Sequence, residues 1–186
     1  MAQKGQIWND PVTGDIVEVL ETGKENNGER LCYRFTLKPG GFRPVLHIHE
    51  KQDEVFEVIT GKLTYNLNGK TQVAKAGETV TLPKGEAHTH YNGETNEDLV
   101  MIQSIRPAFD SETLIDSILG LTKDKKIING KPKFLQVMVW LRYYKAKTYL
   151  AQVPVVVQNA LAYVLAPVAR MLGYKAAYKE YSGVDA

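Results

Sequence analysis

Two histidines and one glutamate in the first third of the chain have the types and spacing of metal ligands. His47 and His49 are separated by one residue, and Glu54 follows five positions after the second histidine. Alternate residues of a β-strand point to the same face, so the two imidazoles would project side by side. If residues 54–60 form a second strand that pairs antiparallel with the first, Glu54 faces back toward both rings. Each residue alone is an ordinary surface residue, but the three together indicate a metal site.

A second polar segment, residues 77–92, adds a third histidine. His88 follows a strand-like stretch and a Pro-Lys-Gly turn. His90 lies two positions further on, so in a regular strand it shares the face of His88, either as a plain rim histidine or in contact with a substrate. Phe56 and Val58 alternate along the strand that carries the glutamate and would line an apolar interior. We therefore predict a small-molecule pocket beside the metal site, lined by Phe56, Val58 and His90.

Together these residues resemble the cupin family. Its first motif is a glycine, five residues, His-x-His, three or four residues, a glutamate, six residues and a glycine. The matching positions here are Gly41, His47, His49, Glu54 and Gly61. Its second motif is a glycine, five residues, Pro-x-Gly, two residues, a histidine, three residues and an asparagine. Here these positions are Gly77, Pro83, Gly85, His88 and Asn92. The resemblance covers residues 30–106.

The resemblance implies a jelly-roll β-barrel that binds one divalent transition-metal ion through His47, His49, Glu54 and His88. Three imidazoles and one carboxylate suit Fe, Mn, Ni, Co, Cu or Zn better than Ca or Mg. Four protein ligands on a six-coordinate ion leave two positions for water, substrate or dioxygen. We therefore expect a metal-dependent, dioxygenase-type oxidoreductase that acts on a small organic molecule. A non-oxidative isomerase, lyase or hydrolase, and a protein that binds or senses a small ligand without turnover, stay open as alternatives.

The chain divides into two parts with different patterns. Residues 1–106 contain 12 Lys and Arg against 15 Asp and Glu, whereas residues 107–186 contain 11 against 6. Between Asp124 and Glu180 there is no acidic residue. Short β-rich runs fill the first part, and helical periodicity begins after it. We predict a mainly β fold, with a jelly-roll cupin β-barrel followed by a C-terminal α-helical extension: residues 1–108, residues 109–180, and a short tail, residues 181–186.

Periodicity also predicts the individual elements. The strand-like runs are residues 15–21, 30–37, 54–60, 62–68, 78–83 and 98–105. In the extension, a helix that opens at Ser111 has one apolar face, formed by Leu114, Ile115, Ile118 and Leu119. Residues 133–150 show a second helical period, with Phe134, Val137, Met138, Leu141 and Tyr144 at its apolar positions.

Residues 148–169 contain no charged side chain, and Lys147 and Arg170 bracket them. Their length alone makes a candidate membrane span, but their glutamines and prolines, and basic residues on both flanks, argue against one. We favour burial of the apolar face against the barrel or across a subunit interface, and so predict a homodimer. The alternative is a membrane-surface or lipid contact through residues 133–172. The long apolar run argues against a nucleic-acid partner.

The amino-acid composition further narrows the class of protein and its possible partners. Of the 186 residues, 24% are charged and 44% are hydrophobic, which argues against disorder, and a net charge of +2 does not suggest a polyanion partner. One cysteine excludes an intramolecular disulfide and a thiolate-rich metal site. The first residues show no apolar signal-peptide core, so we expect a cytoplasmic protein. Peripheral membrane association is the alternative, because of the apolar run at residues 148–169.

Overall fold

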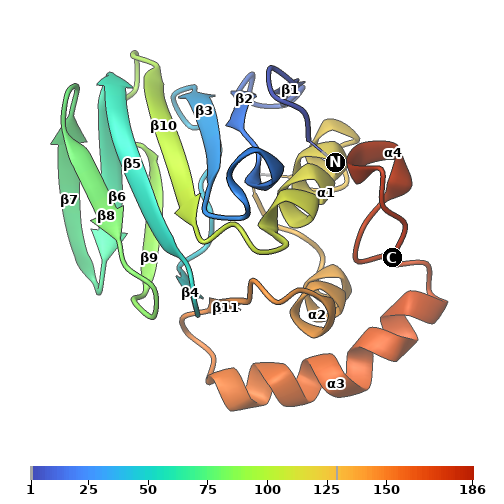
Figure 1. The fold of residues 1–186 in the computed structure, drawn as a ribbon. Helices are drawn as coiled ribbons and strands as arrows, with labels where there is room; N and C mark the ends of the chain where they lie inside the picture. Colours follow the sequence, from blue (N-terminus) through green and yellow to red (C-terminus); the bar gives the residue numbers. More distant parts are fainter. Residues whose placement is uncertain (1, 129) are drawn as a thin grey trace.

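The computed structural model describes residues 2–128 and 130–186, and its strands form two antiparallel sheets packed face to face (Figure 1). In these residues the six strands of the first sheet lie in the order β1 (Ile7–Asn9), β2 (Ile16–Glu21), β3 (Leu31–Leu37), β10 (Leu99–Arg106), β5 (Asp53–Thr60) and β8 (Thr79–Leu82). The five strands of the second lie in the order β11 (Thr148–Leu150), β4 (His47–His49), β9 (His88–Asn92), β6 (Lys62–Leu67) and β7 (Lys70–Lys75). The predicted mainly β, jelly-roll fold is confirmed.

An apolar core between the sheets holds them together. The first sheet contributes Leu37, Phe56, Val58, Leu82, Leu99 and Met101, and the second contributes Leu63 and Ala74. All are buried, because alternate residues of each strand point to the shared interior. Phe56 and Val58 therefore lie inside, as their alternation predicts.

The histidine strand and the glutamate strand do not pair with each other, which corrects the hairpin considered for them. β4 pairs with β9 and β11, whereas β5 pairs with β10 and β8. The short link between them crosses from one sheet to the other. Gln52 in this link is buried, and its amide donates to Pro107 O at 2.6 Å and to Ser111 Oγ at 2.8 Å. Glu54 consequently faces the histidines across the gap between the sheets.

All six predicted strand runs form strands, but β1, β7 and β11 were not predicted. β7 is polar and exposed along most of its length, so its own residues carry little strand signal. Its signal lies in the turn before it, where Asn68 and Gly69 both adopt positive φ angles, 52° and 82°. Asn-Gly is the sequence that favours such a two-residue hairpin turn. β11 is only three residues long and lies within the apolar run, where no alternation marks it.

The helical extension is confirmed, but the second predicted helical period, residues 133–150, is helical only from Phe134 to Tyr143, and its last three residues form a strand. The elements of the extension in the described residues are α1 (Ser111–Lys123), α2 (Phe134–Tyr143), α3 (Val155–Met171) and α4 (Lys179–Ser182), while a 3₁₀ turn, η1 (Gly23–Asn26), joins β2 to β3. In Figure 1, α1 and α4 lie beside the β1 edge of the first sheet, and α2 and α3 lie below the sheets. β11, between α2 and α3, pairs with β4. The extension therefore adds a strand to the barrel.

Residues 148–169 do not form one element, so the candidate membrane span is wrong. They are divided between β11 and α3, and Pro154 stands immediately before the first residue of α3. The strand residues are held by pairing to β4, which leaves 17 residues for the helix. None of the helices in the described ranges has both the length and the apolar character that crossing a bilayer requires.

Helix α1 buries a different face from the predicted one. Its four predicted apolar residues are only partly buried, and they are divided between two apolar clusters, one at the barrel edge and one against α2 and α3. The helix is enclosed on both sides, so the polar strip between the clusters is buried as well. Asp116 and Ser117 are 0% exposed, and both carboxylate oxygens of Asp116 lack a hydrogen-bond partner. Burial raises the pKa of Asp116 from 3.8 to about 7.

This buried carboxyl predicts a pH dependence of stability. Because the pKa of Asp116 is higher in the folded than in the unfolded chain, the folded state binds more protons between these values. Its contribution is fully present below the unfolded pKa and is lost as the pH rises through about 7. At about 1.4 kcal/mol per pKa unit, we expect the free energy of unfolding to fall by roughly 2 to 4 kcal/mol between about pH 4 and pH 8.

Asp116→Asn tests this expectation, because it keeps the shape of the side chain and removes its titration. Denaturant unfolding at a series of pH values should show a shallower decline for the variant, which should be the more stable protein at about pH 8. The pKa of Glu112 on the same helix is also raised by burial, so Glu112→Gln should change the slope in the same direction. Equal slopes in the wild type and Asp116→Asn would contradict the assignment.

Candidate metal centre

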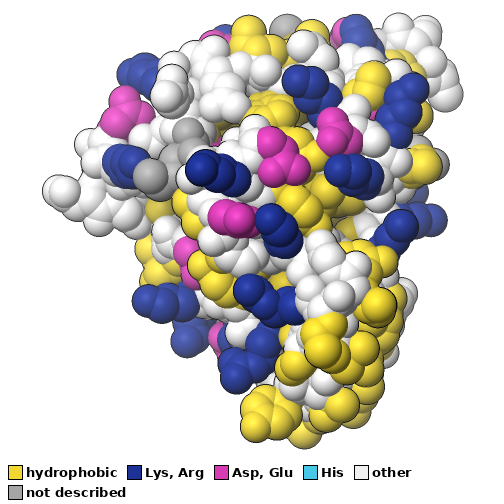
Figure 2. Space-filling view, turned by 90° about the vertical axis from the view of Figure 1, so that its right-hand side faces the viewer, with side chains coloured by type: hydrophobic (Ala, Val, Ile, Leu, Met, Phe, Trp, Pro, Cys, Tyr) yellow, Lys and Arg dark blue, Asp and Glu magenta, His cyan; other side chains and the backbone are white. Residues whose placement is uncertain are grey.

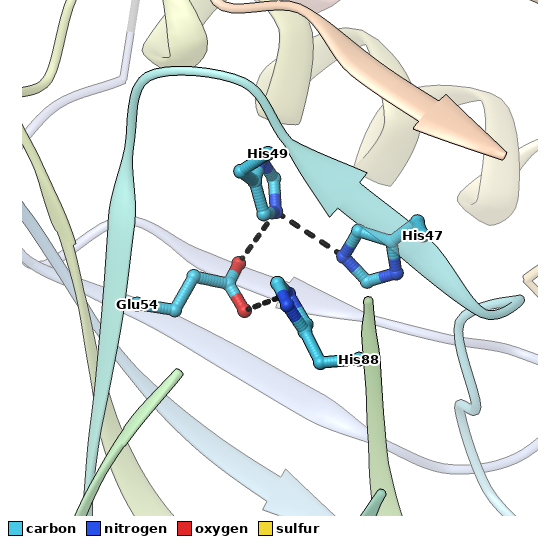
Figure 3. Close-up of side chains that lie close together, drawn as sticks. All are labelled: His47, His49, Glu54 and His88. Atoms are coloured by element: carbon cyan, nitrogen blue, oxygen red, sulfur yellow. Dashed lines mark hydrogen bonds and ion pairs between the residues drawn. The ribbon is translucent and has the colours of Figure 1, made fainter. Parts of the chain in front are cut away.

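The four side chains predicted to bind a metal lie together between the two sheets (Figure 3). Each offers one ligand atom, and these atoms all lie within 4.8 Å of one another. β4 and β9 carry the histidines on the second sheet, and β5 carries the glutamate on the first. Pairing of β4 with β9 sets His47 directly opposite His88. All four side chains, His47, His49, Glu54 and His88, are buried.

The Nε2 atoms of the three histidines point toward one another and toward the carboxylate. His49 Nε2 lies 3.2 Å from His47 Nε2 and 3.1 Å from Glu54 Oε1. His88 Nε2 lies 3.4 Å from Glu54 Oε2. Three nitrogens and a carboxylate from three different strands therefore converge on one point, although the glutamate comes from the opposite sheet.

In His47 and His88, a hydrogen bond made by Nδ1 determines that Nε2 is the nitrogen free to bind a metal. His47 Nδ1 donates to Val45 O at 2.7 Å, and His88 Nδ1 donates to Glu86 O at 2.9 Å. A carbonyl oxygen can only accept, so in the neutral ring the proton is on Nδ1 and the lone pair is on Nε2. Metal-binding histidines are commonly oriented by such a bond from the second ring nitrogen.

The residues present fit a metal ion. Glu54 Oε2 and His88 Nε2 are buried without a hydrogen-bond partner, although buried polar atoms are ordinarily satisfied. The lone pair of His47 Nε2 faces another ring nitrogen at 3.2 Å. A cation between these atoms would satisfy all of them at once. Imidazole nitrogen with one carboxylate is the donor set of Fe, Mn, Co, Ni, Cu and Zn sites.

The charge states also match those of metal ligands. Burial, assisted by the neighbouring His49, lowers the pKa of His47 to about 3, so this ring is neutral at physiological pH. Burial alone would raise the pKa of Glu54, but the adjacent His49 and His88 hold it well below its usual range. His47 and Glu54 are therefore in the forms that bind a metal, neutral imidazole and ionised carboxylate.

Two supporting residues were missed by the sequence analysis. Gln103 on β10 is buried, and its Nε2 donates to Glu54 Oε1 at 2.9 Å. The sequence could have indicated Gln103, because it is polar while Leu99, Met101 and Ile105, on the same face of the strand, are apolar. Thr148 on β11 lies with its Oγ1 3.1 Å from His49 Nδ1. It opens an apolar run far along the chain, so nothing in its neighbourhood indicated contact with a histidine.

The three predicted pocket residues are all buried, and two of them, Phe56 and His90, pack against each other. His90 is buried, its ring centroid lies 4.5 Å from that of Phe56, and its Nδ1 has no hydrogen-bond partner. Burial lowers the pKa of His90 to about 4, so it too is neutral at physiological pH. Val58 belongs to the same inter-sheet core as Phe56. Contact of these three residues with a substrate stays a prediction.

The segment that leads into the first ligand is fixed by a buried carboxylate. Asp15 accepts from the backbone N–H of Lys38 at 2.7 Å and of Phe42 at 2.6 Å. A Cβ atom on Gly41 would collide with this carboxylate, which explains the glycine at the start of the first motif. The asparagine of the second motif, Asn92, donates to the carbonyls of Leu37 and Glu97 at 2.9 and 2.8 Å. Motif residues that bind no metal thus position those that would.

Comparisons with known proteins agree with this arrangement. The family model described as "Cupin domain" matches residues 33–104. The "Probable oxidoreductase virH" of Hypocrea virens is 34% identical over 188 aligned positions, which span 91% of this chain and 84% of the relative. The chain belongs to the cupin superfamily.

Two further similarities are confined to part of this cupin. The "Oxalate-binding protein" of Thermotoga maritima is 29% identical over 89 residues, 47% of this chain and 73% of the relative. The solved structure of KdgF from Halomonas sp. covers 56% of this chain and 90% of its own, with 18% identity and a TM-score of 0.47. The virH alignment spans far more of the chain than the barrel occupies, so it must include much of the helical extension.

The geometry predicts that metal binding by this cupin depends on His47 and His88. His88→Ala and His47→Ala should each lower the bound transition metal from about one ion per chain to a small fraction, because each removes a nitrogen donor. His90→Gln is the matched control, a substitution of a buried histidine outside the group of four, and should retain the metal. The measurement is elemental analysis of protein purified without chelators. Unchanged metal content in both alanine variants would refute the ligand assignment.

A second prediction concerns the residue that the helical extension supplies. Thr148→Val keeps the shape of the side chain but removes the hydroxyl beside His49 Nδ1, so the ring loses its orienting partner. We expect the affinity for the metal to fall about 10-fold or more. Thr148→Ser restores a hydroxyl and should bind nearly as tightly as the wild type. Competition with a chromophoric chelator measures both, and equal affinities for the Val and Ser variants would show that the hydroxyl has no role.

Proposed function

We propose that this cupin is a metal-dependent oxidoreductase of the dioxygenase type that acts on a small organic molecule. The observation that carries the proposal is the donor set, three imidazole nitrogens and one carboxylate, which fits redox-active ions. The helical extension supports this set through Thr148, whose Oγ1 lies 3.1 Å from His49 Nδ1. The relative described as a probable oxidoreductase aligns over both parts of the chain, which supports the same class.

The side chains have separate roles in this proposal. His47, His49, Glu54 and His88 would hold the ion, which when bound would supply the redox and Lewis-acid chemistry that these side chains lack. Gln103 keeps the carboxylate of Glu54 turned toward the three rings. The backbone carbonyls of residues 45 and 86 keep the free Nε2 atoms of two rings directed inward. Burial of all four side chains keeps bulk water away from the reacting atoms.

The surroundings favour a small and largely apolar substrate. Phe56 belongs to the apolar core between the sheets and packs against the ring of His90. His90, neutral and with an unpartnered Nδ1, offers a hydrogen bond to one polar group of the substrate. A phenol, enol or diketone combines an apolar body with an oxygen that could reach the metal position.

A second function is favoured by a different observation. The oxalate-binding protein of Thermotoga maritima is 29% identical to this chain over 89 residues. On this alternative the barrel binds a small carboxylate or a similar ligand without turnover. The predicted homodimer, the cytoplasmic location and the division at residues 108 and 180 stay predictions in either case.

Oxygen consumption tests the oxidoreductase proposal. Protein freed of metal and loaded anaerobically with Fe(II), Mn(II), Co(II), Ni(II) or Cu(II) is mixed with aerated phenolic, enol and diketone compounds in an oxygen electrode. We expect at least one redox-active ion to support substrate-dependent oxygen uptake, with product detected by mass spectrometry. Protein loaded with Zn(II) is the matched control, because the same ligands then hold an ion without redox chemistry, and its rate should be lower by about 100-fold or more.

The outcomes separate the two functions. Oxygen uptake that needs both the substrate and His88 supports the oxidoreductase. The binding function would replace the oxidoreductase proposal if two results are found together. The metal-replete protein would consume no oxygen with any compound, and it would carry an unchanged small acid through purification. Detection of that acid by mass spectrometry of the denatured protein supplies the second readout.

A further inference from the structure

Helix α3 turns its small side chains inward and its large apolar side chains outward. Its buried positions are Gln158, Ala162, Ala166 and Ala169, which form the stripe next to α2. Its outer positions include Val156, Tyr163, Val164, Val168 and Met171, which are between 43% and 80% exposed. A surface helix of a water-soluble domain ordinarily has the reverse pattern. Figure 2 shows hydrophobic side chains gathered over the lower end of the molecule, and Figure 1 places α3 at that end.

The surroundings of this apolar face are basic. Between residues 125 and 179 the chain contains ten Lys and Arg and no acidic residue. Arg142 and Arg170 are exposed, and the Arg142 guanidinium lies 5.4 Å from the centre of the Tyr163 ring. A groove of about 290 Å³ lies between α2 and α3, lined by Leu141, Arg142, Lys147, Asn159, Ala162 and Tyr163. Two cations therefore line a groove that borders the apolar face.

We propose that the outer face of α3 docks on the surface of an anionic lipid bilayer. An apolar helix face bordered by Lys and Arg is the pattern of a helix that lies in the membrane interface, with the apolar side chains among the acyl chains and the cations at the headgroups. The groove at Arg142 and Lys147 would receive a lipid phosphate. Lys147 Nζ donates to Leu141 O at 2.6 Å, and an ammonium group has further N–H donors for a phosphate. The helix lies on the membrane and does not cross it, since no described helix is long and apolar enough to span one.

Charge favours the bilayer over a second copy of this chain as the cover for α3. A two-fold interface through this face would bring the basic border of one copy near the same border of the other. No acidic side chain of this segment is available to neutralise it. An anionic bilayer supplies both the apolar layer for Val156 and Val164 and the counter-charge for Arg142 and Arg170.

The test is sedimentation of the full-length, metal-loaded protein with phosphatidylcholine vesicles that contain about 30% phosphatidylserine. We expect binding that is weak on pure phosphatidylcholine and that decreases when NaCl is raised from about 50 to about 300 mM. Val164→Glu should lower the bound fraction at least fivefold, because it places a charge in the apolar face. Its matched control is Val73→Glu, which changes a 52% exposed valine of β7 and should bind like the wild type.

The basic border is tested in the same assay. Arg142→Gln/Arg170→Gln should lower the partition coefficient by about 10-fold or more. Lys70→Gln/Lys84→Gln removes the same charge from the exposed barrel surface and should have less than a twofold effect. Circular dichroism establishes that each variant is folded.

Three results would overturn the proposal. The first is no vesicle binding, and the second is equal binding to neutral and anionic vesicles at every salt concentration. The third is a dimer in light scattering that Val164→Glu dissociates and Val73→Glu does not, because a second copy would then cover α3.

Discussion

The convergence of three imidazoles and one carboxylate in a buried space is the constraint on which the rest of the structure depends. Bringing such groups together out of water is costly unless a partner satisfies them. The histidines belong to one sheet and the glutamate to the other, so the distance between the sheets decides whether the four atoms meet. That distance is set by the apolar core behind the site, which includes Phe56 and Leu63. The core and the candidate metal centre are therefore parts of one packing arrangement.

The crossing between the sheets has to be short and rigid for the same reason. Only residues 50–52 separate β4 from β5. Gln52 attaches this link to the end of β10 and the start of α1 through its side-chain amide. It is buried although glutamine is usually exposed, and its hydrogen bonds compensate for the burial. The first helix of the extension thus helps to place Glu54, which lies two residues after Gln52.

Much of the fold and of the candidate site could be predicted from the sequence, because the signals are local. His47 and His49 share a strand face by the two-residue period, and the motif spacing ties them to Glu54 and His88. The sheet to which each strand belongs could not be predicted, since a three-residue link allows a hairpin or a crossing equally. The burial of Asp116 was also beyond prediction, because it depends on two clusters from distant segments that enclose α1.

The contacts of the helical extension were the feature that the sequence predicted least well. These contacts connect the extension to the candidate metal centre. Gln158 of α3 exchanges two hydrogen bonds with the backbone of Leu150, at 3.0 and 2.9 Å. Leu150 lies on β11, which pairs residue by residue with β4 and places Thr148 opposite His49. A barrel without this segment would leave the edge of β4 unpaired and one ring nitrogen of a candidate ligand without its partner.

The same contacts place the apolar face of α3 two hydrogen-bonded steps from His49. The first step is the buried Gln158 to β11, and the second is Thr148 to the ring. Both involve buried or half-buried groups on regular elements. Helix α3 is therefore connected by hydrogen bonds to the strand that carries Thr148, the partner of a candidate metal ligand. This connection gives a physical reason for the alignment with the oxidoreductase relative to extend beyond the barrel, since barrel and extension build the centre together.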